Sequence, residues 1–206
     1  MEIERVVVGV LQTNCYIVHD SKQAIVIDPG SDADKIISII EKKRLKPKLI
    51  LNTHYHFDHT GANLDIKNMF NIPIAIGNKD AHYLQNAYKD ALVFMIDAKK
   101  SPQADILLKE GDTVALEDIK FVVIETPGHT IGSICLYNKE NAVLFSGDTL
   151  FFESIGRYDL PTGNFDSIIN SINKILKLDE STTVYPGHGP QTTIKHEKIN
   201  NPFIIK

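Results

Sequence analysis

Residues 53–59, THYHFDH, place three histidines and one aspartate within six positions, directly after the apolar run at residues 49–51. Imidazole and carboxylate groups together suit zinc, iron or manganese. In an extended chain His54 and His56 would share one face and His59 would not, so a loop must wrap around any ion. A surface loop that is merely rich in histidine is the alternative, but four ligand-type residues directly after a buried strand favour a metal site.

Three later segments each present one residue of the same kind after a strand and a glycine, namely PGHT, SGDT and PGHG. Each segment alone is a weak signal. A catalytic zinc ion needs three protein ligands, whereas two metals about 3.5–4 Å apart need more and usually share a carboxylate. With the cluster, the segments give seven candidate ligands: His54, His56, Asp58, His59, His129, Asp148 and His188. The remaining histidines, His19, His82 and His196, lack this setting and are interpreted as surface or structural residues.

The elements that must position these residues are predicted as two β-rich halves, each with helices. β-Branched runs predict strands at residues 3–10, 15–18, 24–27, 49–51, 72–76, 113–116, 120–125, 133–137, 142–145 and 183–185. Apolar spacing predicts helices at residues 33–45, 61–70, 166–178 and from 194 onward, the first capped by Ser31 or Asp32. Residues 79–103 are expected to form a helix and a loop. This order favours two packed sheets covered by helices over one parallel sheet.

Composition indicates one globular domain. The chain has 206 residues, 43% hydrophobic residues and a net charge of -4, which favours neither nucleic acid nor a membrane as a partner. The basic run at residues 42–44 is explained by the end of a helix. The first ten residues lack the pattern of a signal peptide, and Cys15 and Cys135 are expected to be reduced core thiols. We therefore expect a cytoplasmic protein; its oligomeric state is left open.

On these motifs the chain resembles the metallo-β-lactamase superfamily, and within it the short bacterial relatives of glyoxalase II, the hydroxyacylglutathione hydrolases. The stretches that carry the resemblance are TNCYIV, IDPG, THYHFDHTG, TPGHTIGS, GDTLFFESIGRYDLPTGN and YPGHGPQTTIKHEKINNPF, from about residue 13 to residue 203. The resemblance implies an αββα sandwich of α+β class, a single domain over residues 1–206, without the C-terminal helical domain that contacts glutathione in full-length glyoxalase II.

The resemblance also implies two divalent metal ions, zinc first, with iron or manganese as alternatives. His54, His56 and His129 would hold one ion, and Asp58, His59 and His188 the other. Asp148 would bridge them. Asp28 matches a position that orients a ligand, although a turn and helix-capping role is equally compatible with its place in IDPG.

The implied chemistry is hydrolysis of a thioester such as S-lactoylglutathione to lactate and glutathione. Two cations that share one water lower its pKa and hold hydroxide at neutral pH. A thiolate leaves without a general acid, because a free thiol has a pKa of about 8.5. Asp58 is expected to act as a ligand first and also to orient the nucleophile.

Substrate contacts are expected at Arg157, Tyr158 and Lys195, although a structural ion pair between Arg157 and Asp159 is the favoured interpretation of the GRYD loop. The alternatives to the thioesterase are a persulfide dioxygenase with a single iron and a lactonase or other ester hydrolase. The presence of Asp58, His59 and His188 together favours the dinuclear hydrolase over the dioxygenase. An RNA-processing nuclease is disfavoured by the acidic chain.

Overall fold

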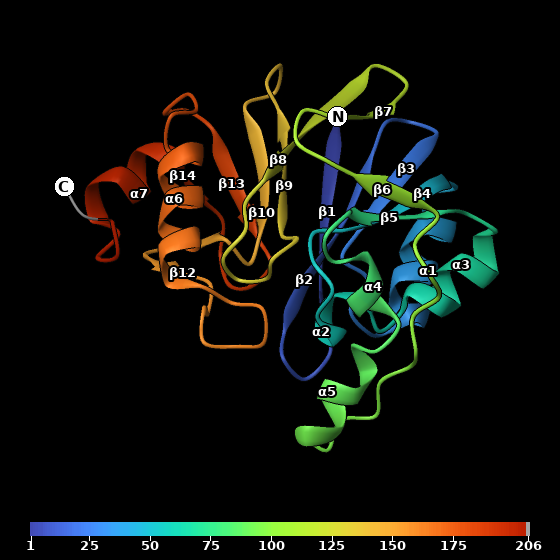
Figure 1. Cartoon of the computed structure of the whole chain (residues 1–206). Coiled ribbons are helices and arrows are strands. Elements are labelled where there is room, and N and C mark those ends of the chain that lie inside the picture. Colours follow the sequence, from blue (N-terminus) through green and yellow to red (C-terminus); the bar gives the residue numbers. More distant parts are fainter. Residues whose placement is uncertain (205–206) are drawn as a thin grey trace.

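Two six-stranded sheets pack face to face, and helices cover the outer face of each (Figure 1). The computed structural model describes residues 1–204; residues 205 and 206, the end of the predicted domain, lie outside it. The four-layer αββα arrangement confirms the predicted fold class and the choice of two sheets over one.

The first sheet has the strand order β1-β2-β3-β4-β5-β6. Strands β1 to β3 are antiparallel neighbours, whereas β3, β4, β5 and β6 run parallel. Its members are β1 (Glu2–Val8), β2 (Thr13–His19), β3 (Gln23–Ile27), β4 (Lys46–Asn52), β5 (Ile74–Gly77) and β6 (Ile106–Leu108).

The second sheet has the order β14-β13-β10-β9-β8-β7. It is an antiparallel meander up to β10, and β13 is then added parallel to β10. Its members are β7 (Thr113–Leu116), β8 (Ile119–Glu125), β9 (Ile134–Asn138), β10 (Val143–Gly147), β13 (Thr183–Pro186) and β14 (Thr192–Thr193). A small ribbon, β11 (Leu150–Phe151) with β12 (Ser154–Ile155), follows β10.

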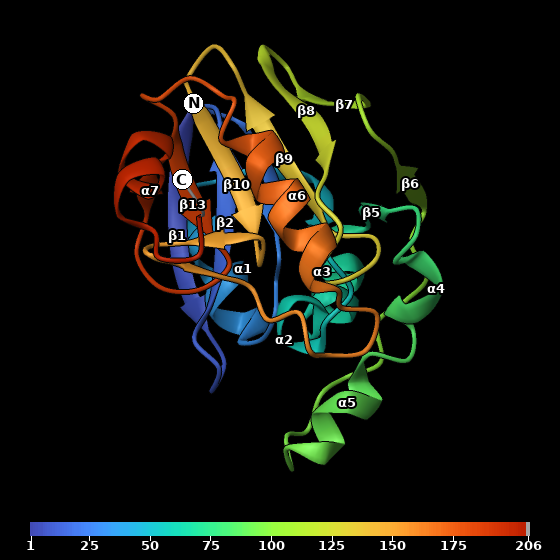
Figure 2. The ribbon, with the colours of Figure 1, turned by 60° about the vertical axis from the view of Figure 1, so that its left-hand side comes forward.

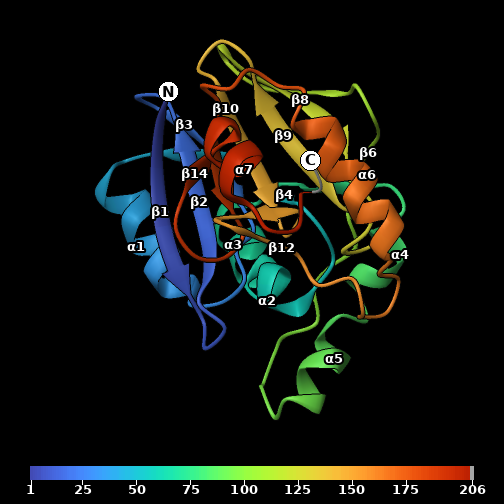
Figure 3. The ribbon, with the colours of Figure 1, turned by 90° about the vertical axis from the view of Figure 1, so that its left-hand side faces the viewer.

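Helices lie on both outer faces. The first half contributes α1 (Ala33–Lys42), α2 (Phe57–Thr60), α3 (Asn63–Phe70), α4 (Ala81–Leu84) and α5 (Tyr88–Val93). The second half contributes α6 (Phe165–Ile175) and α7 (Ile194–Asn200). Figure 2 shows α6 lying across the strands of the second sheet, and Figure 3 shows α7 beside β14. The side chains of Asn164 and Thr193 cap α6 and α7 by accepting hydrogen bonds from Ser167 N and His196 N.

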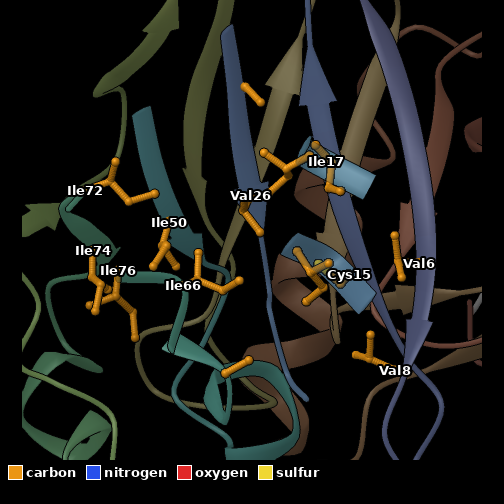
Figure 4. Packing of buried hydrophobic residues seen from close by; sticks show 14 of the residues in the cluster. Val6, Val8, Cys15, Ile17, Val26, Ile50, Ile66, Ile72, Ile74 and Ile76 are labelled. Carbon is orange, nitrogen blue, oxygen red and sulfur yellow. The ribbon is translucent and has the colours of Figure 1, made fainter. Parts of the chain in front are cut away.

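Alternation along the strands builds separate apolar layers. In β3, Ala24 and Val26 face the helices α1 and α3, whereas Ile25 and Ile27 face the second sheet. Figure 4 shows the first of these layers around Val26 and Ile50. A third layer fills the space between the second sheet and the helices α6 and α7. The central strands β2, β3, β5 and β10 are thus buried on both faces, and their positions are fixed from both sides.

Several details differ from the sequence-based expectations. The first helix ends at Lys42 rather than residue 45. Asp32 has a left-handed backbone and does not cap this helix; its carboxylate accepts a hydrogen bond from Gly9 N instead. The helix expected at residues 61–70 is confirmed as α3, which begins at Asn63, and the separate turn α2 before it was not predicted. Residues 79–103 contain two short helices, and the strand β6 after them was not predicted.

Candidate metal centre

All seven candidate ligands lie at one edge of the two sheets. Strands β8, β10 and β13 run in the same direction, because β9 is antiparallel to both β8 and β10, and β13 is parallel to β10. Their carboxyl ends therefore lead to His129, Asp148 and His188 at one edge. In the first sheet β4 leads to His54 there, and Figure 2 shows the arrowhead of β10 at the same end of the molecule as α2.

Three imidazoles, those of His54, His56 and His129, form the first group. Their ring centroids lie 4.6–4.8 Å apart, and each residue offers one nitrogen within 4.8 Å of the others. His54 and His56 come from the loop after β4, and His129 comes from the turn after β8. The first sheet therefore supplies two histidines of this group, and the second sheet supplies the third.

Asp58, His59 and His188 form the second group. His188 Nε2 lies 3.2 Å from Asp58 Oδ2 and 3.3 Å from His59 Nε2. The single turn α2 brings His59 back beneath the loop, so that its ring centroid lies 4.1 Å from that of His54. In an extended chain His59 would point away from His54 and His56. The turn α2 removes this difficulty, because it directs His59 toward His54.

Asp148 lies between the two groups. Its Oδ1 is 3.4 Å from His59 Nε2, and its Oδ2 is 3.5 Å from His129 Nε2 and 3.6 Å from His188 Nε2. One carboxylate thus faces members of both groups, which is the arrangement that a ligand shared by two ions requires.

The outer ring nitrogens of His129 and His188 are held by hydrogen bonds. His129 Nδ1 donates to the carbonyl of Arg157 at 2.7 Å, and His188 Nδ1 donates to the carbonyl of Leu11 at 3.1 Å. A carbonyl oxygen can only accept, so the proton is assigned to Nδ1 and the lone pair to Nε2. The lone pairs consequently point into the centre, as a metal ligand requires.

Asp28 performs the same task for one histidine of each group. Its carboxylate accepts from His59 Nδ1 at 3.1 Å and from Thr53 Oγ1 at 2.7 Å. The Thr53 hydroxyl, having donated its proton to Asp28, can accept from His54 Nδ1 at 3.1 Å. Asp28 is 2% exposed and is not a helix cap. The geometry therefore favours the ligand-orienting role over the capping role that the sequence left open.

Several polar atoms at the centre fit a cation. Within residues 1–204, His54 Nε2, His129 Nε2 and Asp148 Oδ1 are buried and have no hydrogen-bond partner. The 3.4 Å approach of Asp148 Oδ1 to His59 is too poorly aligned to count as a hydrogen bond. Buried polar atoms are costly to leave unpaired, and nitrogen and carboxylate donors aimed at one point suit divalent transition metals.

The two groups differ in their protonation. Burial and the neighbouring imidazoles lower the pKa of His54 well below its usual range and that of His56 to about 3. In the second group burial opposes ionisation, but contacts with the carboxylates raise the pKa of both His59 and His188. Burial would raise the pKa of Asp58, yet His59 and His188 lower it to about 2. The carboxylates of the second group therefore favour positive charge on their neighbours, and a metal ion would supply it in place of protons.

Residues at the start of β2, which motif reasoning did not single out, support the second group. Thr13 Oγ1 donates to Asp58 Oδ2 at 2.9 Å. The side-chain amide of Asn14 donates to the carbonyls of Pro186 and Gly189, both at 2.9 Å, so it holds the chain on either side of His188. TNCY carries the family resemblance, but nothing in its local pattern reveals partners more than 170 positions away.

The three residues expected to contact substrate each have different surroundings in the structure. Arg157 forms a two-pronged ion pair with Asp159, with both distances 2.9 Å, as the favoured interpretation predicted. The Tyr158 ring packs against Phe165. Lys195 is an exposed residue of α7. A substrate role for these side chains stays a prediction.

A cavity of about 1260 Å³ adjoins the centre at Asp58 and Thr13. Its walls come from the β1–β2 turn, the start of α1, the helices α2 and α3 and the chain after α5, and they include Val10, Leu11 and Met95. Arg157, Tyr158 and Lys195 are not among its lining residues. Figure 1 shows α5 projecting beyond α2 at this end of the molecule.

The other histidines have the structural or surface surroundings that were expected. His82 packs on Tyr83, and His196 stacks on Phe152 and contacts Glu153. His19 faces Glu2 and Glu4, but the ammonium of Lys43 already lies 2.7 Å from Glu4 Oε1. Both cysteines are buried free thiols, as predicted.

Comparison with known proteins decides the family. Residues 8–188 match the model of the metallo-beta-lactamase superfamily. The chain belongs to the metallo-β-lactamase superfamily. Members of this superfamily are metal-dependent hydrolases, and the histidine and aspartate groups above suggest a dinuclear metal site.

The chain is similar to one curated relative and two solved structures in particular. "Hydroxyacylglutathione hydrolase GloC" of Haemophilus influenzae is 37% identical, with 99% of this chain and 98% of GloC covered. The crystal structure of the "BLEG-1 B3 metallo-beta-lactamase" superposes with a TM-score of 0.93 at 39% identity, with each chain fully covered. That of "TTHA1623 in a di-iron-bound form" gives 0.91 at 36% identity, covering 97% of this chain and 99% of the other. These similarities leave the metal and the substrate of this superfamily member open.

Within residues 1–204, none of the helices combines the length and apolar character needed to cross a membrane.

Proposed function

We propose that the protein is a dinuclear metal-dependent thioester hydrolase of the hydroxyacylglutathione type. The observation that carries the proposal is the position of Asp148, whose two oxygens face His59 and His129, one from each ligand group, at 3.4 and 3.5 Å. His54, His56 and His129 are proposed to hold one ion, Asp58, His59 and His188 the other, and Asp148 both. Zinc is the expected metal, and iron or manganese would fit the same donors.

Two divalent cations in this place supply Lewis-acid polarisation of a carbonyl oxygen and an ionised water at neutral pH. The protein's own residues hold the donor atoms in place. Asp28 orients His59 directly and His54 through Thr53. Thr13 donates to Asp58 Oδ2 and so fixes the carboxylate that we propose orients the nucleophile. Placing these groups beforehand lowers the cost of reaching the transition state.

A thioester is the proposed substrate because a thiolate is a good leaving group. Asp58 and Asp148 are poor acids for protonating a worse leaving group, since the neighbouring imidazoles lower the pKa values of both against the effect of burial. The similarity to GloC over nearly the whole chain supports S-lactoylglutathione as the first substrate to test. We treat residues 1–206 as one hydrolase domain in the cytoplasm, acting on a small molecule.

The single-iron dioxygenase is the weaker alternative. It would leave Asp58, His59 and His188 without a function, although these three lie within 3.2–3.4 Å of one another. Lactones, other esters and β-lactams present carbonyls that the same nucleophile could attack, and they belong in the substrate panel. The resemblance to a B3 metallo-β-lactamase structure makes the β-lactam assay informative.

The decisive experiment compares Asp148→Ala with the wild type. We expect the variant to lose metal at both positions, and thioester hydrolysis to fall at least a thousandfold. Asp166→Ala, which removes an exposed carboxylate in the first turn of α6, is the control and should behave as wild type. Full metal content with full activity in Asp148→Ala would refute the assignment. One iron per wild-type chain with oxygen uptake on glutathione persulfide would establish the dioxygenase instead.

A further inference from the structure

Asp80 is a fully buried carboxylate outside the seven candidate ligands. It lies between β5 and α4 and has 0% exposure. Three donors converge on it: Gly132 N to Oδ1 at 2.7 Å, and Thr130 Oγ1 and Tyr55 N to Oδ2 at 2.7 and 3.1 Å. A buried carboxylate persists only when it is paired in this way.

The donors belong to the two segments that carry the first ligand group. Tyr55 stands between His54 and His56, and Thr130 directly follows His129. Tyr55 follows β4 of the first sheet, whereas Thr130 and Gly132 precede β9 of the second. One carboxylate therefore ties together the backbones on which all three histidines of the first group are mounted, across the junction between the sheets.

The space around Asp80 is shaped to let the second segment close on it. A Cβ at Gly132 would lie 2.3 Å from Asp80 N and 2.5 Å from its Oδ1, and a Cβ at Gly77 would lie 2.1 Å from Gly132 O. Any side chain at these positions would push the His129 segment away. The two glycines thus allow a contact that only a bare backbone can make.

The second ligand group is held by other residues. His188 is fixed through Leu11 and Asn14, and Asp58 through Thr13. Asp80 makes none of its hydrogen bonds to these supporting residues or to the second group itself. The two ligand groups are thus supported by different side-chain contacts, although both share Asp28 and the loop of residues 54–59.

We propose that Asp80 is a positioning residue for the first ligand group, setting the affinity of one of the two metal ions without touching either. This inference rests on the proposed dinuclear site. Asn at this position keeps an acceptor for Gly132 but turns an NH₂ group toward the N–H of Tyr55, so the His54–His56 loop loses its anchor. Partners of metal ligands typically change metal affinity by roughly 10–100-fold when removed.

The test titrates metal-free protein with Co²⁺ and follows the visible absorption and the number of equivalents bound. In Asp80→Asn we expect one of the two equivalents to bind about 10–100-fold more weakly, with a changed absorption band, and the other to bind within twofold of wild type. Glu197→Gln is the matched control. Glu197 is also fully buried and also accepts three hydrogen bonds, from Glu153 N, Thr192 and Asn201, but it serves α7.

Two equivalents that bind to folded Asp80→Asn as they bind to the wild type would overturn the inference. If Asp80→Asn does not fold, Thr130→Val removes a single donor to Asp80, and a threefold or greater loss at one equivalent is expected; wild-type binding by it would equally overturn the inference. The readout needs no thioester. If the wild type binds one equivalent only, the proposed dinuclear function fails, and the inference stands or falls on whether Asp80→Asn weakens that equivalent.

Discussion

Asp28 Oδ2 lies 3.1 Å from His59 Nδ1 and also accepts the Thr53 hydroxyl that faces His54. One carboxylate thus orients a histidine from each ligand group. Its oxygens accept three hydrogen bonds from Thr53 and His59 in a fully enclosed place, where no water can replace a lost partner.

We predict that Asp28→Asn lowers the affinity for the metal at His59 about 10–100-fold. The amide can no longer accept from both the Thr53 hydroxyl and the His59 N–H with the strength of a carboxylate. Metal titration of the purified protein measures the effect. Asp34→Asn, an exposed residue of the first turn of α1, should bind metal as the wild type does, and equal affinity in the two variants would contradict the role given to Asp28.

Gly187 supplies a second prediction, because a side chain there would enter the metal centre. A Cβ would lie 2.1 Å from Asp148 Oδ1 and 2.7 Å from His59 Cε1. We expect Gly187→Ala to displace the Asp148 carboxylate and to reduce bound metal from two equivalents to one or none.

Gly189, two positions later, is the matched control. Its φ of +74° strains any other residue, but nothing lies within 4 Å of its Cβ position. Gly189→Ala should therefore lose about 1–2 kcal/mol of unfolding free energy and keep both metals. Elemental analysis beside urea unfolding separates the outcomes; intact metal content in Gly187→Ala would show that the centre tolerates the added methyl.

The Arg157–Asp159 pair leads to a third prediction. Both side chains are 61% exposed, so solvent and salt screen the pair and it should contribute little to stability. If the pair is structural, Arg157→Ala and Asp159→Ala will change KM for the thioester by less than about twofold and to the same degree. A rise in KM confined to Arg157→Ala would instead assign the guanidinium to the substrate, as the sequence also allowed.

Asp80 gives a prediction about pH. Burial raises the pKa of Asp80 from 3.8 to about 6, against the effect of its three donors. The folded protein therefore binds this proton more tightly than the unfolded chain does. The fold is more stable at low pH than at neutral pH, and this extra stability is lost as the pH rises through 6. The shift corresponds to about 3 kcal/mol.

The measurement is urea unfolding of metal-free wild type and Asp80→Asn between pH 4 and pH 7. The other titrating groups are common to both proteins and cancel in the difference. The free energy of unfolding of the wild type should fall relative to Asp80→Asn by about 2 kcal/mol over this interval, since part of the full change lies below pH 4. A difference that is constant with pH would mean that Asp80 has an ordinary pKa.

The sequence predicted the fold class and gathered the seven candidate ligands because their signals are local. His129, Asp148 and His188 each follow an apolar strand and a glycine. This pattern can be recognised in the local sequence without knowing which segments pack together. The seven residues do meet at one edge, but their roles as ligands remain a prediction until metal is measured.

The supporting residues could not be found in the same way. Asp80 occurs in GNKDAH, which is typical of an ordinary helix start, and its partners are 25, 50 and 52 positions away. Asp32 looked like a helix cap, but it bonds to Gly9 N on the neighbouring turn. The short helix α2 was missed because its four residues also contain two candidate ligands, and a single turn has no apolar periodicity.

The division of the ligand set between the sheets couples metal binding to the assembly of the fold. Residues 54–59 belong to one half of the chain and residues 129–188 to the other, so an ion held by both acts as a cross-link that forms only after the halves have docked. Such a cross-link would close a loop of 73 residues between His56 and His129 (129 − 56) or of 129 residues between His59 and His188 (188 − 59). It would stabilise the native state by about 4 kcal/mol at a thousandfold excess of free metal over Kd. With metal bound as proposed, the concentration of free metal would set the stability of the docked halves as well as the rate of the proposed reaction.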